Sequence, residues 1–370
     1  MYDSHYKVLE NIEDVFLKKG WQTQYIYLNK DNKKDLVTNH KILNVKEIQS
    51  FFQDNIIITA IGGRYLNYIK SSNPYATIVS LYPGIIVHQN IEDLITKSTS
   101  DILLLNSKKD MSIYNKIASS LGIKNNAIVY GVGWYKIVEN TEKNNKKDFL
   151  FIEQSDIPYT DDERKKLVEK LYLITINNDC HCYIKLRITS NINTSPNKQS
   201  TSLDKIVKEL NYDDKIKFVN KDLNLLIGTF QNIVGISTSA LLEAIIAKKN
   251  VFVLNDFGDN KYFVDFFEDS GLVIGSSDVI FNKSLVLNKN WYNLNITNPT
   301  NSLEMIYDSI ENYKKENDSK IMKDSLKYFF IRILFKLSLT ELLTIGIKNL
   351  YRKSQKSFNI MSLQGFRIQK

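Results

Sequence analysis

The chain has 370 residues and a formal net charge of +8 at neutral pH, with 43% hydrophobic and 24% charged residues. This composition excludes wholesale disorder, and the length suits two domains with sizeable cores. The positive charge indicates an anionic partner. Because the lysines are scattered and arginine is sparse, the pattern favours a phosphate-bearing small molecule or an anionic membrane surface, and no nucleic acid is expected.

Helical and strand-like segments alternate from the start of the sequence. An amphipathic helix is predicted over residues 2–19, with Gly20 as its stop. Further segments follow as strands at 21–28, 54–61, 76–85, 101–107 and 127–133 and as helices at 45–53, 65–70, 90–97 and 111–121. This alternation predicts a parallel sheet with helices on both faces. The strand expected before Asp3 is missing or lies upstream of the assigned start.

A polar, charged stretch at residues 139–148 has no apolar spacing, so it is expected to link an N-terminal domain, 1–138, to a second domain, 149–300. Thr160 and Glu163 form a capping-box pattern that predicts the start of a helix. The second domain repeats the alternation, with strands expected at 149–154, 182–187 and 215–219, helices at 203–210 and 223–228, and a polar loop at 190–202.

The stretch 233–257 carries the strongest functional signal. A short apolar run meets Ser237, Thr238 and Ser239, a run rich in Ala, Leu and Ile carries Glu243, and a second apolar run ends before Asp256. This pattern predicts strand, tight turn, buried helix and strand. A turn at the carboxyl end of a parallel strand presents hydroxyls and free N–H groups at a helix N-terminus, which favours an anion. The alternative is that Thr238 or Ser239 only caps the helix.

The tail, residues 301–370, is expected to form C-terminal helices. Its most apolar part, 325–350, carries five charged residues, which argue against a membrane-spanning helix. Two explanations stay open: a basic amphipathic segment that lies on an anionic membrane, or a helix that crosses back and packs on the first domain.

The cysteines, Cys180 and Cys182, flank His181 and would point the same way on a strand. No second Cys/His cluster completes four ligands, so a structural zinc site is not expected. Few cysteines and the absence of a signal-peptide pattern predict a cytoplasmic protein, peripheral on the inner face of the cytoplasmic membrane if the tail binds lipid.

Six short stretches carry a family resemblance: DSHY at 3–6, YPGI at 82–85, FIEQSDIPYTDDER at 151–164, YIKLR at 183–187, ISTSALLEAIIAKKNVFVLNDFG at 236–258 and DNKYFVDFFEDSGLV at 259–273. They resemble bacterial GT-B glycosyltransferases of nonulosonic acids, the sialyltransferase- and pseudaminyltransferase-like enzymes of capsule and surface-glycan synthesis. The resemblance implies two Rossmann-like domains facing a cleft, a CMP-sugar donor, an oligosaccharide or glycolipid acceptor, and neither a metal nor another cofactor.

The resemblance also implies which residues serve the donor phosphate. Many such sialyltransferases end the strand equivalent to 183–187 with His-Pro and open the later helix with Ser-Ser or Ser-Thr. The turn at 237–239 matches the second pair, but Lys185 and Arg187 stand where His-Pro is expected, which puts a histidine general acid in doubt. Fixed cations can stabilise the departing phosphate of CMP without proton transfer.

Other site residues are expected on both sides of the cleft. Glu243 lies one helical turn after the anion site, where a carboxylate can accept from ribose hydroxyls, and Gln154 ends its strand near the cytosine or ribose. Asp256 is a further donor-binding candidate. Each is otherwise a polar group satisfied within its own domain.

The first domain is expected to supply the general base, and Asp3 and His88 are candidates if they are not plain surface residues. Gly62, Gly63 and Arg64 follow a strand, where the lack of side chains lets a sugar approach the backbone, unless they form an ordinary tight turn.

Two rival functions stay open. One is a GT-B transferase or epimerase that uses a UDP- or GDP-sugar, and the other is a non-catalytic, membrane-attached glycan-binding protein that has kept the fold.

Overall fold

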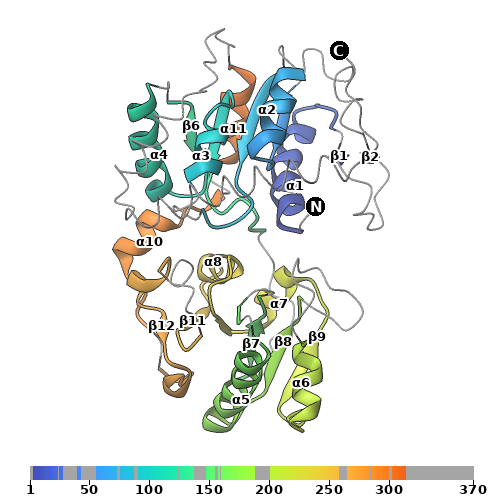
Figure 1. Cartoon of the computed structure of the whole chain (residues 1–370), viewed down its shortest axis with the longest axis vertical. Helices are drawn as coiled ribbons and strands as arrows, with labels where there is room; N and C mark the ends of the chain where they lie inside the picture. Colours follow the sequence, from blue (N-terminus) through green and yellow to red (C-terminus); the bar gives the residue numbers. More distant parts are fainter. Residues whose placement is uncertain are drawn as a thin grey trace, which may run out of the picture.

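The computed structural model shows two parallel sheets, each with its own helices (Figure 1). This confirms the expected α/β class. The structure describes residues 3–23, 25–27, 40–42, 56–72, 76–86, 91–122, 125–136, 147–154, 157–158, 160–187, 201–257, 265–283, 285–299 and 302–313.

The first half of the chain forms a four-stranded parallel sheet in the order β3-β4-β5-β6. Its strands are β3 (Ile56–Thr59), β4 (Thr77–Leu81), β5 (Ile102–Leu105) and β6 (Ala127–Val129). Its helices are α1 (Asp3–Lys18), α2 (Gly63–Ser72), α3 (Ile91–Lys97) and α4 (Lys108–Leu121). A separate parallel pair consists of β1 (Tyr25–Tyr27) and β2 (His40–Ile42). Strand β5 is buried at every position, as expected for a parallel sheet covered on both faces.

The second half forms a six-stranded parallel sheet in the order β12-β11-β10-β7-β8-β9. Its strands are β7 (Phe149–Ile152), β8 (Cys182–Lys185), β9 (Ile216–Val219), β10 (Asn232–Gly235), β11 (Asn250–Leu254) and β12 (Val273–Ile274). Its helices are α5 (Asp161–Asn178), α6 (Leu203–Glu209), α7 (Leu223–Thr229), α8 (Ala240–Ile246) and α10 (Lys289–Asn295), with short 3₁₀ turns η3 (Glu268–Ser270) and η4 (Ser276–Asp278).

Successive side chains along the strands of this sheet point to opposite faces and pack into two separate hydrophobic cores. Phe149 and Phe151 of β7 join the cluster that includes the apolar face of α5 and α6. Leu150 and Ile152 point the other way and join a cluster that includes α7 and α8. Figure 1 shows α8 on the side of the second half that faces the first half. The two faces of the second sheet are therefore covered by different helix pairs.

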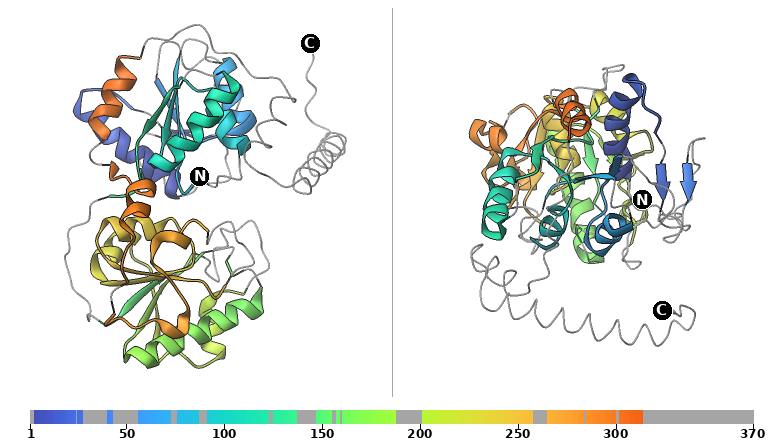
Figure 2. Two further views of the ribbon diagram at one scale, coloured as in Figure 1. Left: turned by 90° about the vertical axis from the view of Figure 1, so that its left-hand side faces the viewer. Right: turned by 90° about the horizontal axis from the view of Figure 1, so that it is seen from above.

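The core on the α8 face continues into the first half. The same cluster includes Ile12 of α1, Leu81 of β4, Trp134 and Leu241 of α8. The last described helix, α11 (Leu303–Glu311), packs on α1, where the rings of Phe16 and Tyr307 lie 5.0 Å apart. The described part of the C-terminal region thus crosses back to the first half, as the left view in Figure 2 shows.

Local signals explain several element boundaries. The capping box that opens α5 is confirmed, because the Thr160 hydroxyl accepts from the Glu163 N–H at 3.3 Å while the Glu163 carboxylate accepts from the Thr160 N–H. Ser107 caps α4 in the same way through the N–H of Asp110. The predicted helix at 45–53, the linker at 139–146 and the basic tail at 325–350 lie outside the described residues. Within the described ranges, no helix combines the length and apolarity needed to cross a bilayer.

Candidate functional site

The sheet of the second half reverses its strand order between β7 and β10. From β7 the chain moves outward through β8 and β9, and it then returns to β10 on the other side of β7. The loops after β7 and β10 therefore lead to helices on opposite faces of the sheet, α5 and α8. Open parallel sheets bind ligands outside the carboxyl ends of their strands at such a switch point.

Two sequence-predicted residues meet at this switch point. The Gln154 Oε1 accepts from the backbone N–H of Ser237 at 2.8 Å, and the Gln154 Nε2 donates to the Ser237 hydroxyl at 3.3 Å. The ladder pairs Phe151 with Val234, so Gln154 and Ser237 lie opposite each other three residues beyond that pair. The structure thus brings together the strand end and the turn that the sequence singled out separately.

The predicted cations lie on the next strand in the same row. Lys185 pairs with Ile152 in the ladder, and two residues further along Arg187 lies opposite Gln154. Since strands are spaced about 4.8 Å apart, the backbones of Arg187 and Ser237 are separated by roughly 10 Å. Lys185 shares the α7–α8 face with Tyr183, whose ring lies 5.0 Å from that of Phe230. That these two cations serve an anion at the turn stays a prediction.

The hydroxyls of the turn differ in their surroundings. Ser237 and Thr238 are buried and Ser239 is half-buried. The Thr238 hydroxyl accepts from the Ala240 N–H at 3.3 Å, and Ser239 makes no side-chain cap bond. Capping therefore accounts for one of the three hydroxyls.

A buried ion pair that the sequence did not suggest supports this row from the other face. Arg164 of α5 donates to Glu153 at 2.5 Å, and both side chains are almost fully buried. The second oxygen of Glu153 accepts from the backbone N–H of Arg187 at 2.6 Å. Glu153 therefore fixes the main chain from which Arg187 projects. The signal available in the sequence was a carboxylate directly after an apolar strand.

Glu243 is the most perturbed carboxyl group near the turn. It is 3% exposed, and its Oε2 has no hydrogen-bond partner among the described residues. Burial raises the pKa of Glu243 to about 8, opposed by the positive charge of Lys7 in α1. It lines a cavity of about 130 Å³ with Tyr135 and Lys136 of the first half and Asn224 of α7. A carboxyl group placed there can both donate and accept a hydrogen bond at neutral pH.

Asp256 lies at the carboxyl end of β11, and its carboxylate is already engaged. It accepts from Lys170 at 2.7 Å and from the backbone N–H of Ser276 at 2.8 Å. Although burial opposes them, these hydrogen bonds hold the pKa of Asp256 below its usual value. Its role in donor binding stays a prediction.

The first-half candidates are described only in part. Asp3 is the first residue of α1. Gly62 lies between β3 and α2, Gly63 is the first residue of α2, and Arg64 is in its first turn. His88 lies outside the described residues. The catalytic assignments of Asp3 and His88 stay predictions.

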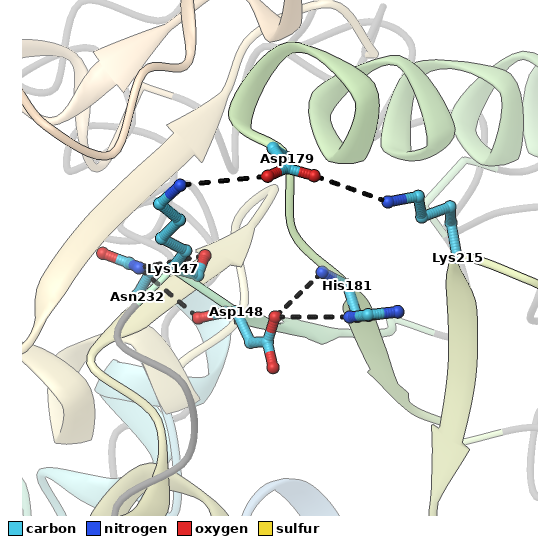
Figure 3. A network of polar contacts seen from close by, with 6 residues as sticks. All are labelled: Lys147, Asp148, Asp179, His181, Lys215 and Asn232. Carbon is cyan, nitrogen blue, oxygen red and sulfur yellow. Dashed lines mark hydrogen bonds and ion pairs between the residues drawn. The ribbon is translucent and has the colours of Figure 1, made fainter.

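The Cys180-His181-Cys182 motif lies at the opposite end of the sheet. Figure 3 shows His181 in a polar network at the amino ends of the strands, where Asp148 accepts from the His181 backbone N–H at 2.9 Å. The thiols are buried in the core, and burial raises the pKa of Cys180 to about 12. Among the described side chains, no group of three or more His, Cys, Asp or Glu is arranged to hold a metal ion.

A larger cavity, of about 380 Å³, lies away from the switch point. Its walls come from the end of α8, the start of β11, the segment before α10 and α10 itself, and include Lys248, Asn250, Leu285 and Tyr292. Asn250 is the first residue of β11, whereas the turn follows the last residue of β10. Size alone therefore does not locate the site. The convergence of polar groups at the carboxyl edge favours the switch point.

Comparison with known sequences identifies one family. The model of a family described as "Putative glycosyltransferase (DUF6716)" matches residues 29–311. The match includes both sheets and every described element from β2 to α11. No curated protein sequence gives a significant match.

Comparison with solved structures identifies the fold. UDP-GlcNAc 2-epimerase from Methanocaldococcus jannaschii is similar with a TM-score of 0.56 and 14% identity, over 84% of this chain and 98% of that one. The wall teichoic acid polymerase TagF is similar with a TM-score of 0.51 and 11% identity, over 82% of this chain and 85% of that one. These similarities confirm the expected arrangement of two parallel-sheet halves as GT-B-like. At such identities they show the fold alone.

Proposed function

The chain belongs to this family, "Putative glycosyltransferase (DUF6716)", and from that premise we propose that it moves a nonulosonic acid from a CMP-sugar to a hydroxyl of a surface glycan. The observation that carries the proposal is the row formed by Arg187, Gln154 and Ser237 across β8, β7 and β10. It gathers a cation, an amide and a hydroxyl at the switch point of the second sheet. Cationic and hydroxyl donors of this kind can bind a phosphate, and an amide can bind a ribose or a base.

The donor phosphate is proposed to lie between the cations and the turn. Lys185 and Arg187 approach it from β8, while Ser237, Thr238 and Ser239 donate from the start of α8. During transfer the bond from the anomeric carbon to the phosphate oxygen breaks, and CMP leaves with the bonding electrons. Fixed positive charge stabilises the departing phosphate without a proton, so the absence of His-Pro from this strand is compatible with catalysis.

The nucleoside is proposed to extend from the phosphate toward α8 and the first half. Glu243 follows Ser239 by one helical turn and lies at the cavity that Tyr135 and Asn224 also line. With its raised pKa it is mainly protonated at neutral pH, so it can donate to one ribose hydroxyl and accept from the other. Gln154 is proposed to contact the cytosine or ribose, and Asp256 is a further donor-binding candidate.

The acceptor is proposed to enter from the first half. Its hydroxyl oxygen bonds to the anomeric carbon, and its proton passes to a first-half base, for which Asp3 and His88 are the proposed groups. The backbone at Gly62, Gly63 and Arg64 is proposed to meet the acceptor sugar. An oligosaccharide or glycolipid of the cell surface is the proposed acceptor, and attachment of the tail to an anionic membrane would bring the enzyme to a glycolipid.

A UDP-sugar enzyme is the alternative, because a structure that shares the fold is named UDP-GlcNAc 2-epimerase. Nucleotide binding separates the two. A thermal-shift series with CMP, CDP, UDP and GDP is expected to show stabilisation by CMP. Stabilisation by UDP and not CMP would support the alternative, and stabilisation by none would favour a glycan-binding protein without catalysis.

Turnover tests the proposal directly. The protein is incubated with CMP-sialic acid or CMP-pseudaminic acid and a galactose-terminated oligosaccharide, and the products are weighed by mass spectrometry. The expected result is an acceptor heavier by one nonulosonic acid residue, with release of CMP. The variant that combines Lys185→Ala and Arg187→Ala is expected to lose this product while keeping the fold. Release of CMP at the background rate with wild-type protein and both donors would refute the proposal.

A further inference from the structure

Lys97 is a buried lysine that the proposed donor site does not use. It lies at the end of α3, it is 2% exposed, and its ammonium group donates to three backbone carbonyl oxygens. These belong to Ala60 at 2.9 Å, Ile61 at 3.2 Å and Leu81 at 3.1 Å. An ammonium has three N–H donors, so each donor has a main-chain acceptor.

The acceptors explain why a cation is kept in this core. Ala60 and Ile61 follow the last residue of β3, and Leu81 is the last residue of β4. Carbonyl groups at strand ends have no further ladder partner, and leaving them buried without a hydrogen bond costs free energy. Burial lowers the pKa of Lys97 to about 8, and the charge of Asp93, one turn earlier in α3, opposes this shift. The ammonium also lies 4.9 Å from the centre of the Tyr82 ring.

The two segments that Lys97 joins lead into the proposed acceptor edge. Gly62 and Gly63 follow directly after Ala60 and Ile61, whose carbonyls Lys97 binds. A Cβ on Gly62 would overlap the carboxylate of Asp93, so the turn packs closely against α3. Gly63 adopts a φ of +61°, which is in the left-handed region. Helix α3 therefore fixes the position and direction of the backbone at the carboxyl ends of β3 and β4.

We propose that Lys97 is a positioning residue for the acceptor: by tying the ends of β3 and β4 together, it sets the backbone surface on which the acceptor sugar rests. This inference rests on the proposed transferase function, which supplies the acceptor sugar. The positioning itself rests on the three hydrogen bonds of Lys97. Lys97 touches neither the donor nor the reacting atoms. Its loss acts on acceptor binding and leaves the donor site in the other half intact.

Steady-state kinetics with CMP-sialic acid and a galactose-terminated oligosaccharide test the proposal. Lys97→Met removes all three donors and is expected to raise KM for the acceptor roughly tenfold or more, while KM for the donor and the slow hydrolysis of the donor by water stay near wild type. Lys97→Arg keeps charge and donors and is expected to restore most of the acceptor affinity. Lys116→Met, the same change at an exposed position of α4, serves as the control. An equal loss of donor and acceptor use, or no loss of either, overturns the proposal.

Hydrogen–deuterium exchange gives a readout that does not need turnover. In Lys97→Met, faster exchange is expected at 60–64 and 81–86, with the second half unchanged and Lys97→Arg close to wild type. If the wild type transfers no sugar from either CMP donor, the transferase function fails while this pattern still supports the positioning role. Exchange that stays unchanged at both segments, or that rises throughout the first half, overturns the positioning role whatever the enzyme transfers.

Discussion

Breaking the buried pair between Glu153 and Arg164 is expected to destabilise the second half strongly. The side chains are 1% and 0% exposed, so solvent cannot replace a lost partner. In Glu153→Leu the guanidinium keeps a hydrogen bond to the Thr201 carbonyl, and its Nη1 already has no partner among the described residues. An unpaired buried charge of this kind costs about 3–5 kcal/mol. Arg164→Met leaves the carboxylate with the Arg187 N–H and should cost a similar amount.

Replacing both residues, Glu153→Leu with Arg164→Met, should cost much less than the sum, because no charge then stays buried. Urea unfolding followed by circular dichroism measures the three free energies. Single changes that cost less than about 1 kcal/mol would show that the pair is solvated, which contradicts the reasoning. The double variant should still bind CMP more weakly, because the main chain at Arg187 has lost its acceptor.

Three further predictions concern single residues. The pKa of Glu243 is raised from 4.5 to about 8, so between these values the folded chain holds a proton that the unfolded chain has lost. The free energy of unfolding should therefore fall as pH rises from 4.5 to about 8. Melting curves measured over this pH range should show a flatter profile in Glu243→Gln. Gln154→Ala removes both bonds to Ser237 and should weaken CMP binding about tenfold in a fluorescence competition assay; it should also lower the melting temperature by several degrees, because the buried Ser237 N–H loses its acceptor. Gly62→Ala places a methyl group against the carboxylate end of Asp93, which must rotate away, so the change should cost about 1 kcal/mol in urea unfolding. Adding Asp93→Ala should recover this cost, and a double-mutant cycle with no coupling would refute the packing described.

Periodicity and local motifs predicted much of the fold. The helix expected at 2–19 is α1, from Asp3 to Lys18, and the capping box at Thr160 opens α5. These signals depend on neighbours within one or two turns, so they can be read directly from the sequence. The alternation of strands and helices along the chain also predicted the parallel sheets, because successive parallel strands need a helix to connect them.

The partners of buried polar groups could not be predicted in this way. Lys97 bonds to carbonyls 16 to 37 residues away, and Arg164 bonds to a carboxylate directly after the preceding strand. Sequence patterns show which side of an element is buried, but a lysine at the end of an exposed-looking helix resembles any surface lysine. Gln154 and Ser237 were found because both end strands, yet their direct contact required the strand order.

Calorimetric titration of CMP tests most directly whether the cations and the hydroxyl turn share one phosphate. Wild type should bind CMP in preference to UDP, and Arg187→Ala and Ser237→Ala should each weaken binding by roughly tenfold. Lys215→Ala removes a cation that pairs with Asp179 at the opposite edge of the sheet and should leave the affinity unchanged. Equal affinities in all three variants, or binding of UDP with none of CMP, would contradict the account.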